Sequence, residues 1–258
     1  MTTRQSYEVI GRGYAGRRRP DPRIEAAIVE ALGDARTVLN VGAGTGSYEP
    51  RDRDGDRGRR VVALEPSTVM LAQRPAGTPA VRGIAEALPF ADRSFDAAMA
   101  VLTIHHWTDW RRGLAEMRRV ARGPVAVLTH DIEAAAGFWL MDYFPAIVER
   151  DRVRMPPVAE VCAALQGDPR TDARTVEVPC DCTDGFLGAF WREPARYLDP
   201  GARAAMSAFA LLPPEDLHRG LHHLARDLRA GAWHERHGSL LDLDSIDLGY
   251  RLVVARPR

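Results

Sequence analysis

Three glycines stand at every second position directly after a short apolar run. The run Val38–Val41 leads into Gly42, Gly44 and Gly46, and Ser47 follows. Glycine lets the backbone approach a ligand closely, because no Cβ intervenes and unusual dihedral angles are open. A dinucleotide-binding loop requires the spacing G-x-G-x-x-G, which aims amides and a helix start at a pyrophosphate. The spacing G-x-G-x-G therefore favours a nucleoside-like ligand without phosphate groups.

An acidic residue ends the next apolar run, Val61–Leu64. Glu65 stands 19 residues after Gly46 and is placed to accept hydrogen bonds from both hydroxyls of a ribose, as the acidic residue of dinucleotide sites does. The glycines alone are also compatible with a tight strand-to-helix turn. Together with Glu65 at strand spacing, they predict a nucleoside-binding loop.

Four motifs in a fixed order carry a family resemblance. Val38–Gly46 resembles the first motif of the class I methyltransferases that use S-adenosylmethionine, and Val62–Ser67 resembles the second. Ala85–Phe90 is similar to the stretch that precedes the fourth strand of that fold. Ile104–Trp107 and Leu114–Val120 are similar to the exit of that strand and to its helix. The resemblance covers roughly half of the chain and is strongest to the small-molecule branch called type 11.

The resemblance implies S-adenosylmethionine as the cofactor and S-adenosylhomocysteine as its product. The cofactor-binding residues that it implies are Tyr14, Asn40, Gly42, Ala43, Gly44, Gly46, Glu65, Pro66, Ser67, Met70, Ala85, Glu86, Val101 and His106. Among them, Glu65 is expected at the ribose diol and Tyr14 over the bound cofactor. Asn40 and Ile84 stand where the family usually has acidic residues. We therefore expect Asn40 to make a weaker contact to the ammonium group of the cofactor. We also expect that the side chain of Ile84 does not recognise adenine.

Two histidines are candidates for the chemistry. Methyl transfer from a sulfonium mainly requires alignment of the nucleophile and exclusion of water. A general base helps only where the acceptor must lose a proton, and histidine suits that task at neutral pH. His106 and His130 follow predicted strands at the edge that faces the crevice, so they are the candidate catalytic residues. For His106 and its neighbour His105, the alternative is that they cap the strand and form local hydrogen bonds.

Substrate contacts are expected from the segment after the glycine-rich half. Trp139 and Tyr143 lie in an aromatic-rich helical stretch, and Cys182 and Phe186 follow a predicted strand. Such side chains suit the wall of a pocket for an apolar acceptor, although ordinary helix packing explains the aromatic residues as well. A C-x-C pair without a second distant pair is a poor zinc motif. We therefore expect no metal.

The elements that position these residues alternate along the chain. Short runs that are apolar on both sides, separated by helical segments, are typical of a parallel sheet covered on both faces. Right-handed crossovers place the ligand crevice at the carboxyl ends of its strands. The strands are expected at Val38–Val41, Val61–Leu64, Pro79–Arg82, Phe95–Leu102, Val125–Thr129, Thr175–Pro179 and Leu248–Ala255. With the resemblance, we expect an α/β fold: a Rossmann-like, doubly wound, seven-stranded sheet, mostly parallel with its last strand antiparallel.

After His130 the pattern becomes helical, beginning with an expected helix over Ala134–Arg150. We interpret these segments as cap insertions over the crevice of a single methyltransferase domain. The expected boundaries are 1–258 for the domain, about 20–130, 172–182 and 246–257 for its core, and about 131–170 and 183–240 for the cap.

Composition limits the partners. Lys and Arg number 35, as do Asp and Glu, so the formal net charge is zero, and bulk charge supplies no attraction to nucleic acid or to an acidic membrane. Three cysteines and the lack of a long apolar stretch fit a cytoplasmic enzyme, expected as a monomer or homodimer. The predicted function is methyl transfer to a small molecule, with an O, N or C nucleophile. The alternatives are a cofactor-binding protein of the same fold without transfer, and a nucleic-acid methyltransferase.

Overall fold

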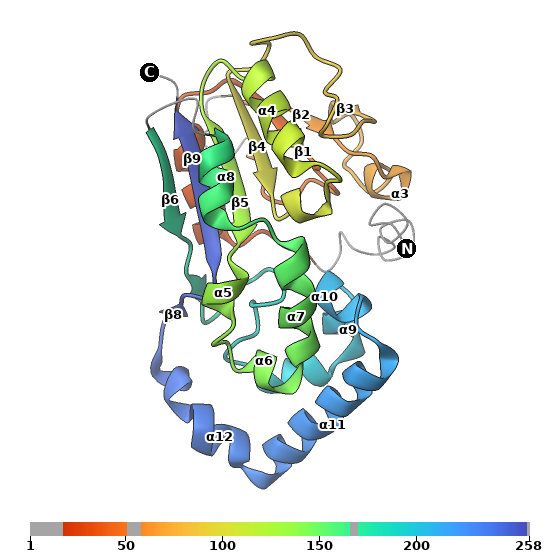
Figure 1. The fold of residues 1–258 in the computed structure, drawn as a ribbon, viewed down its shortest axis with the longest axis vertical. Coiled ribbons are helices and arrows are strands. Elements are labelled where there is room, and N and C mark those ends of the chain that lie inside the picture. The colour runs from red at the N-terminus through yellow and green to blue at the C-terminus, as the bar shows by residue number, and fades with distance from the viewer. Residues whose placement is uncertain (1–17, 51–57, 166–169, 257–258) are drawn as a thin grey trace.

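A seven-stranded sheet organises the chain in the computed structural model, which describes residues 18–50, 58–165 and 170–256 (Figure 1). Its strands are β1 (Thr37–Val41), β2 (Arg60–Leu64), β3 (Ala80–Val81), β4 (Ala97–Val101), β5 (Val125–His130), β6 (Arg170–Thr175) and β9 (Tyr250–Arg256). Their order is β3-β2-β1-β4-β5-β9-β6. Strands β1 to β5 are parallel, and β9 runs antiparallel to both β5 and β6. The predicted doubly wound, mostly parallel sheet with an antiparallel last strand is confirmed.

One strand lies earlier than the sequence pattern predicts. The expected strand Thr175–Pro179 is divided: β6 covers Arg170–Thr175, and Val178–Pro179 forms β7, which pairs with β8 (Ser245–Ile246) outside the main sheet. Strand β6 is an edge strand of mostly polar residues that pairs only with β9. No apolar alternation marks such a strand, because neither of its faces lies deep in the core.

Helices cover the two faces of the sheet. Helix α2 (Pro22–Leu32) packs on one face and α4 (Trp110–Val120) on the other, each capped by an aspartate that precedes it. Along β1, Val38 faces the α2 side and Leu39 the α4 side, and both side chains are fully buried. Successive side chains of a strand point to opposite faces, so they enter two separate cores. Both sets must be apolar, which explains the uninterrupted apolar runs.

Most of the helices that follow β5 form a cap beyond the carboxyl ends of β4 and β5 (Figure 1). They are α5 (Ile132–Ala135), α6 (Leu140–Tyr143), α7 (Pro145–Arg154), α9 (Pro200–Arg203), α10 (Ser207–Ala210), α11 (Pro214–Ala230) and α12 (Ala232–His237), with 3-10 helices at Pro194–Leu198 and Gly238–Asp242. The single helix expected over Ala134–Arg150 is broken into three. Pro145 accounts for the second break, because it has no amide hydrogen and starts α7 at its first position. Across the described ranges, no helix is both long and apolar enough to cross a bilayer.

Helix α8 (Val158–Leu165) belongs with the sheet although it lies inside an expected cap segment. Its Val161 and Leu165 are fully buried in the same core as Leu39 and Leu114. We therefore propose that the core of the domain includes α8 and that the first cap insertion ends before it.

The junction of α11 with α6 and α7 leaves no room for a methyl group at Gly220. An added Cβ would lie 2.3 Å from Cε1 of Phe144 and 2.5 Å from the carbonyl oxygen of Tyr143. We expect Gly220→Ala to lower the free energy of unfolding by about 1–3 kcal/mol, and the Tm by about 2–4 °C for each kcal/mol. Gly238→Ala is the control, because a Cβ there meets nothing within 4 Å. Equal Tm values for the two variants in calorimetry would contradict this packing.

Candidate active site

A cavity of about 540 Å³ opens at the carboxyl ends of β1, β2 and β4. Of the predicted cofactor residues, those that line it are Asn40, Gly42, Ala43, Gly44, Glu65, Pro66, Ser67, Met70, Ala85, Glu86, Val101 and His106. Gly46 is not among the lining residues, and Tyr14 lies outside the described residues. The structure thus brings together residues from four separate segments of the chain.

The glycine loop lies against the exits of two strands. The amides of Gly42 and Ala43 donate to the carbonyl oxygen of Leu64 at the end of β2, at 2.8 and 3.1 Å. Gly42 has φ +70°, and a Cβ there would lie 2.2 Å from Oγ1 of Thr103, the residue that follows β4 by two positions. Only glycine permits this approach. Thr103 therefore shapes the floor of the cavity together with the loop.

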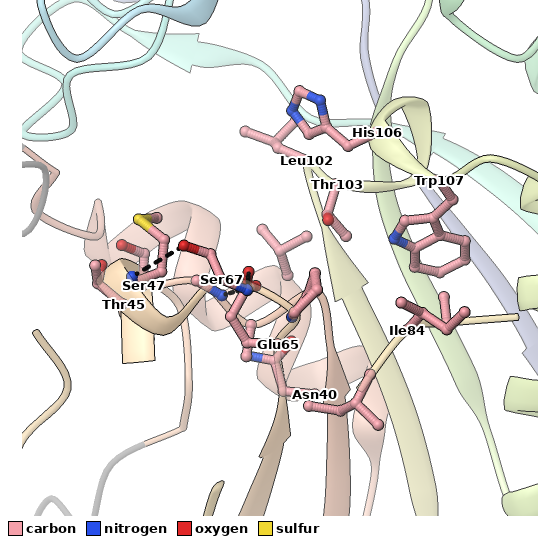
Figure 2. Close-up of a pocket in the computed structure, with 18 of the residues that line it drawn as sticks. Asn40, Thr45, Ser47, Glu65, Ser67, Ile84, Leu102, Thr103, His106 and Trp107 are labelled. Atoms are coloured by element: carbon pink, nitrogen blue, oxygen red, sulfur yellow. Dashed lines mark hydrogen bonds between the residues drawn. The ribbon is translucent and has the colours of Figure 1, made fainter. Parts of the chain in front are cut away.

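Glu65 joins the loops that follow β1 and β2. Its Oε2 accepts from the amide of Gly44 and its Oε1 from the amide of Ser67, both at 2.9 Å, and the residue is only 7% exposed. A carboxylate offers about four acceptor sites, more than these two amides use. Figure 2 shows Glu65 in the middle of the cavity, between Thr45 and Ser47 on one side and Trp107 on the other.

One side of the cavity is an apolar slot. Ile84 and Trp107 form its outer wall (Figure 2), and Met70 and the buried Ala85 also line it. Ile84, which stands where the family has an acidic residue, is 45% exposed and contributes an apolar surface. Glu86 accepts from the amides of Thr108 and Asp109 at 2.7 and 3.1 Å. The slot suits a flat, largely apolar ring with polar edges.

Several lining residues escaped prediction from the sequence. Besides Thr103 and Trp107, the wall includes Arg18 and Tyr48. The Arg18 guanidinium makes a bidentate ion pair with the fully buried carboxylate of Asp184, at 2.6 and 2.9 Å, and the Tyr48 hydroxyl donates to the same carboxylate at 2.8 Å. Burial, together with this carboxylate, raises the pKa of Tyr48. No local pattern reveals a contact between residues 166 positions apart.

Comparisons with known proteins agree with this site. The family described as "Methyltransferase domain" matches residues 39–125. A solved structure of a putative methyltransferase from an antibiotic biosynthesis pathway of Anabaena variabilis is 36% identical, with a TM-score of 0.84 over 92% of this chain and 98% of that one. This chain belongs to the class I S-adenosylmethionine-dependent methyltransferases, in the type 11 family.

Curated relatives of this methyltransferase match just under half of the chain. An uncharacterized methyltransferase of Mycobacterium tuberculosis is 36% identical over 132 residues, which are 47% of this chain and 53% of that protein. A demethylmenaquinone methyltransferase of Renibacterium salmoninarum is 36% identical over 137 residues, 48% of this chain and 56% of that protein. The chain thus spans about half the length of the curated relatives that it matches.

His106 lies on the edge of the cavity that faces the cap of the methyltransferase. An Arg154 nitrogen, from α7, lies 3.3 Å from its Nδ1. Because a guanidinium only donates, Nδ1 accepts, and the neutral ring carries its proton on Nε2. Burial, and next the positive charge of Arg154, lowers the pKa of His106 to about 3. In this arrangement the ring is a hydrogen-bond donor and a weak base.

His130, the other candidate base, is not among the residues that line the cavity. Its Nε2 lies 3.0 Å from the carbonyl oxygen of Leu248, and its ring packs on Tyr250 with centroids 4.7 Å apart. Burial lowers its pKa. These contacts tie the His130 ring to the backbone at Leu248 and to the core, and a catalytic role stays a prediction.

The four expected substrate residues are buried and do not line the cavity. Trp139 donates through Nε1 to the carbonyl oxygen of Trp191 at 2.8 Å, and the Tyr143 hydroxyl donates to Asp227 at 3.1 Å. Cys182 and Phe186 lie in the same core as these side chains. Their substrate contacts stay predictions. Within the described part of the chain, no three His, Cys, Asp or Glu side chains gather as a metal site requires.

The lowered pKa of His106 predicts acid sensitivity. Below about pH 6.5 the unfolded chain takes up a proton at this ring, whereas the folded chain does so only near pH 3. In that range the unfolded state binds more protons than the folded state. The free energy of unfolding therefore decreases as the pH is lowered, by up to about 1.4 kcal/mol per pH unit. We expect His106→Gln to flatten this slope in urea titrations between pH 4 and 8. Identical slopes in parent and variant would contradict the assignment.

Proposed function

We propose that this chain transfers the methyl group of S-adenosylmethionine to a small-molecule acceptor. The observation that carries the proposal is the bridge that Glu65 makes between the amides of Gly44 and Ser67. It sets an acceptor for a ribose diol beside an apolar slot and a glycine loop. No phosphate-binding spacing accompanies it, which disfavours a dinucleotide.

The lining residues fit this cofactor from end to end. Glu65 would hold the ribose hydroxyls, and Met70 and Ala85 would enclose adenine together with Pro66, Ser67 and Glu86. The loop from Gly42 to Gly44 and Val101 would lie along the methionine portion. Asn40 also lines the cavity, and its buried oxygen Oδ1 has no hydrogen-bond partner among the described residues. An unsatisfied buried oxygen is costly, so a ligand that donates there is favoured.

A small-molecule acceptor has two supports. The Renibacterium relative is named for a small quinone-type acceptor, and zero formal net charge gives no bulk attraction to a polyanionic nucleic acid. The cap adds a further argument. Its helices lie beyond the carboxyl ends of β4 and β5 (Figure 1), and its Arg154 contacts His106 at the edge of the cavity. A cap next to the cavity limits the room for an acceptor, which favours a compact molecule over a polymer.

The chain contributes mainly alignment and the exclusion of water. The cofactor supplies a methyl group on a positively charged sulfur, so its leaving group needs no further activation. Tyr48, Leu102 and Thr103 line the cavity, and their side chains would help to keep water from the reacting atoms. His106, with its proton on Nε2, would donate a hydrogen bond that orients the acceptor. The alternative of His106 as general base requires a pKa near the operating pH.

The Glu65 bridge predicts ligand selectivity. By calorimetry, the parent chain should bind S-adenosylmethionine and S-adenosylhomocysteine but not NAD. Glu65→Ala should weaken both by about tenfold or more, because each lost hydrogen bond to a charged group is worth about 1.5–3 kcal/mol. Glu215→Ala, at an exposed position of α11, is the control. An indifferent Glu65 variant, or tighter binding of NAD, would overturn the assignment of the cofactor. Transfer itself is tested by screening small-molecule acceptors for a mass gain of one methylene.

The state of His106 predicts how the rate depends on pH. With a pKa of about 3, the ring does not change charge between pH 5 and 9, so it should cause no inflection there. His106→Asn should lower kcat by about tenfold through lost alignment, equal to about 1.4 kcal/mol, and leave the shape of the profile unchanged. An inflection near pH 6–7 that vanishes in the variant would instead assign the role of general base.

A further inference from the structure

Arg18 brings a positive charge to the wall of the cavity. Within the part of the chain that the structure describes, no other arginine or lysine lines this cavity. The Arg18 side chain is only 8% exposed, so water and salt screen its charge poorly. The cofactor of the proposed function also carries a positive charge, on its sulfur. Like charges that share a buried site oppose each other, so an uncompensated Arg18 would disfavour this cofactor.

The carboxylate of Asp184 offsets the charge of Arg18. Nε and Nη2 of the guanidinium donate to its two oxygens at 2.6 and 2.9 Å, and the carboxylate is fully buried. It also accepts from the Tyr48 hydroxyl at 2.8 Å and from the amide of Gly185 at 2.7 Å. These four donors match the roughly four acceptor sites of a carboxylate. Asp184 is therefore fixed against the guanidinium, and the ion pair has no net charge.

Neighbouring contacts hold the segments of Arg18 and Asp184 together. The amide of Thr183 donates to Oδ2 of Asp21 at 3.2 Å, and the Thr183 hydroxyl donates to the carbonyl oxygen of Pro20 at 3.3 Å. Asp21 is fully buried and caps α2, so this junction is anchored to the sheet half of the molecule. The ion pair therefore does not depend on two freely moving side chains.

Tyr48 connects the ion pair to the side of the cavity away from the apolar slot. It follows Ser47 directly, and Figure 2 shows Ser47 across the cavity from Trp107. Tyr48 is 1% exposed and has φ +61°, a left-handed conformation that is costly for a residue other than glycine. Its bond to Asp184 holds it there. Because the proposed function places adenine in the slot, the ion pair faces the rest of the cofactor, which includes the sulfur.

We propose that Asp184 is a specificity-determining residue, which offsets the charge of Arg18 and thereby allows the cavity to hold the positively charged sulfur of S-adenosylmethionine. The inference rests on the proposed function, because it takes this cofactor as the ligand. It adds that a residue between β7 and the 3-10 helix Pro194–Leu198, outside the cavity lining, sets the preference of the site between the charged cofactor and S-adenosylhomocysteine, whose sulfur is neutral.

The ratio of two affinities tests this role by calorimetry. Asp184→Asn keeps the shape of the side chain and leaves the charge of Arg18 uncompensated. Two unit charges about 10 Å apart, at an effective dielectric constant of about 20, change an affinity by roughly tenfold. We therefore expect the variant to weaken S-adenosylmethionine roughly tenfold more than S-adenosylhomocysteine. An ion pair with a structural role alone would weaken both ligands equally, and that result would overturn the inference.

Arg18→Gln creates the opposite imbalance and provides the test if Asp184→Asn does not fold. At pH 8 it should favour S-adenosylmethionine over S-adenosylhomocysteine by about threefold or more relative to the parent chain. The double variant has neither charge and should return the ratio to within about threefold of the parent. Arg174→Gln is the control, because its ion pairs with Glu30 and Asp172 are partly exposed and away from the cavity lining. Ratios that do not follow the sign of the charge overturn the inference.

Failure of this inference differs from failure of the proposed function. If the parent chain binds neither S-adenosylmethionine nor S-adenosylhomocysteine, the cofactor assignment fails, and the inference fails with it. If it binds both and the ratio is the same in every variant, the cofactor assignment stands and only the role of Asp184 is rejected. Retained binding of S-adenosylhomocysteine also shows that each variant is folded around the cavity.

Discussion

The carboxylate of Glu65 accepts one backbone amide from each of the two loops that form the floor of the cavity, Gly44 after β1 and Ser67 after β2. Each loop leaves its strand at the same edge of a parallel sheet, so neither loop can move without breaking one of these bonds. The same two loops carry further lining residues of the cavity, among them Ser47 and Met70. In the proposed function, the carboxylate that joins the loops also accepts hydrogen bonds from the ribose of the cofactor.

A second constraint holds the opposite end of the cavity. Arg18, Tyr48 and Asp184 form a buried charged cluster that joins the entrance of α2, the glycine loop and the cap. Breaking one member of such a cluster leaves an uncompensated charge inside the protein. Arg18 and Tyr48 line the cavity, and the buried Asp184 holds both of them.

The cap continues the hydrophobic core on the α2 side of the sheet. Trp139 contacts the rings of Tyr143 and Trp233 edge-on, and its indole nitrogen is bonded to the backbone at Trp191. Such contacts fix the short helices against one another, although none of them is long enough to be stable alone. The cap therefore presents a defined surface to the cavity through His106 and its partner Arg154.

The sequence by itself determined the sheet, the glycine loop and the acidic residue after β2. These features are local. A strand that is buried on both faces must be apolar throughout, and position 42 must be glycine because a Cβ there would collide with the Thr103 side chain. The polar edge strand β6 and the breaks in the cap helices escaped prediction, since apolar spacing does not record them.

Only the tertiary structure decided which chemically similar residues reach the cavity. His106 and His130 both follow strands, but one lines the cavity and the other is bonded to the backbone at Leu248. Aromatic residues such as Trp139 have the same spacing whether they line a pocket or fill a core. The ion pair of Arg74 with Glu49 joins residues 25 positions apart in the sequence, and charge pairing across such a distance is set by folding alone.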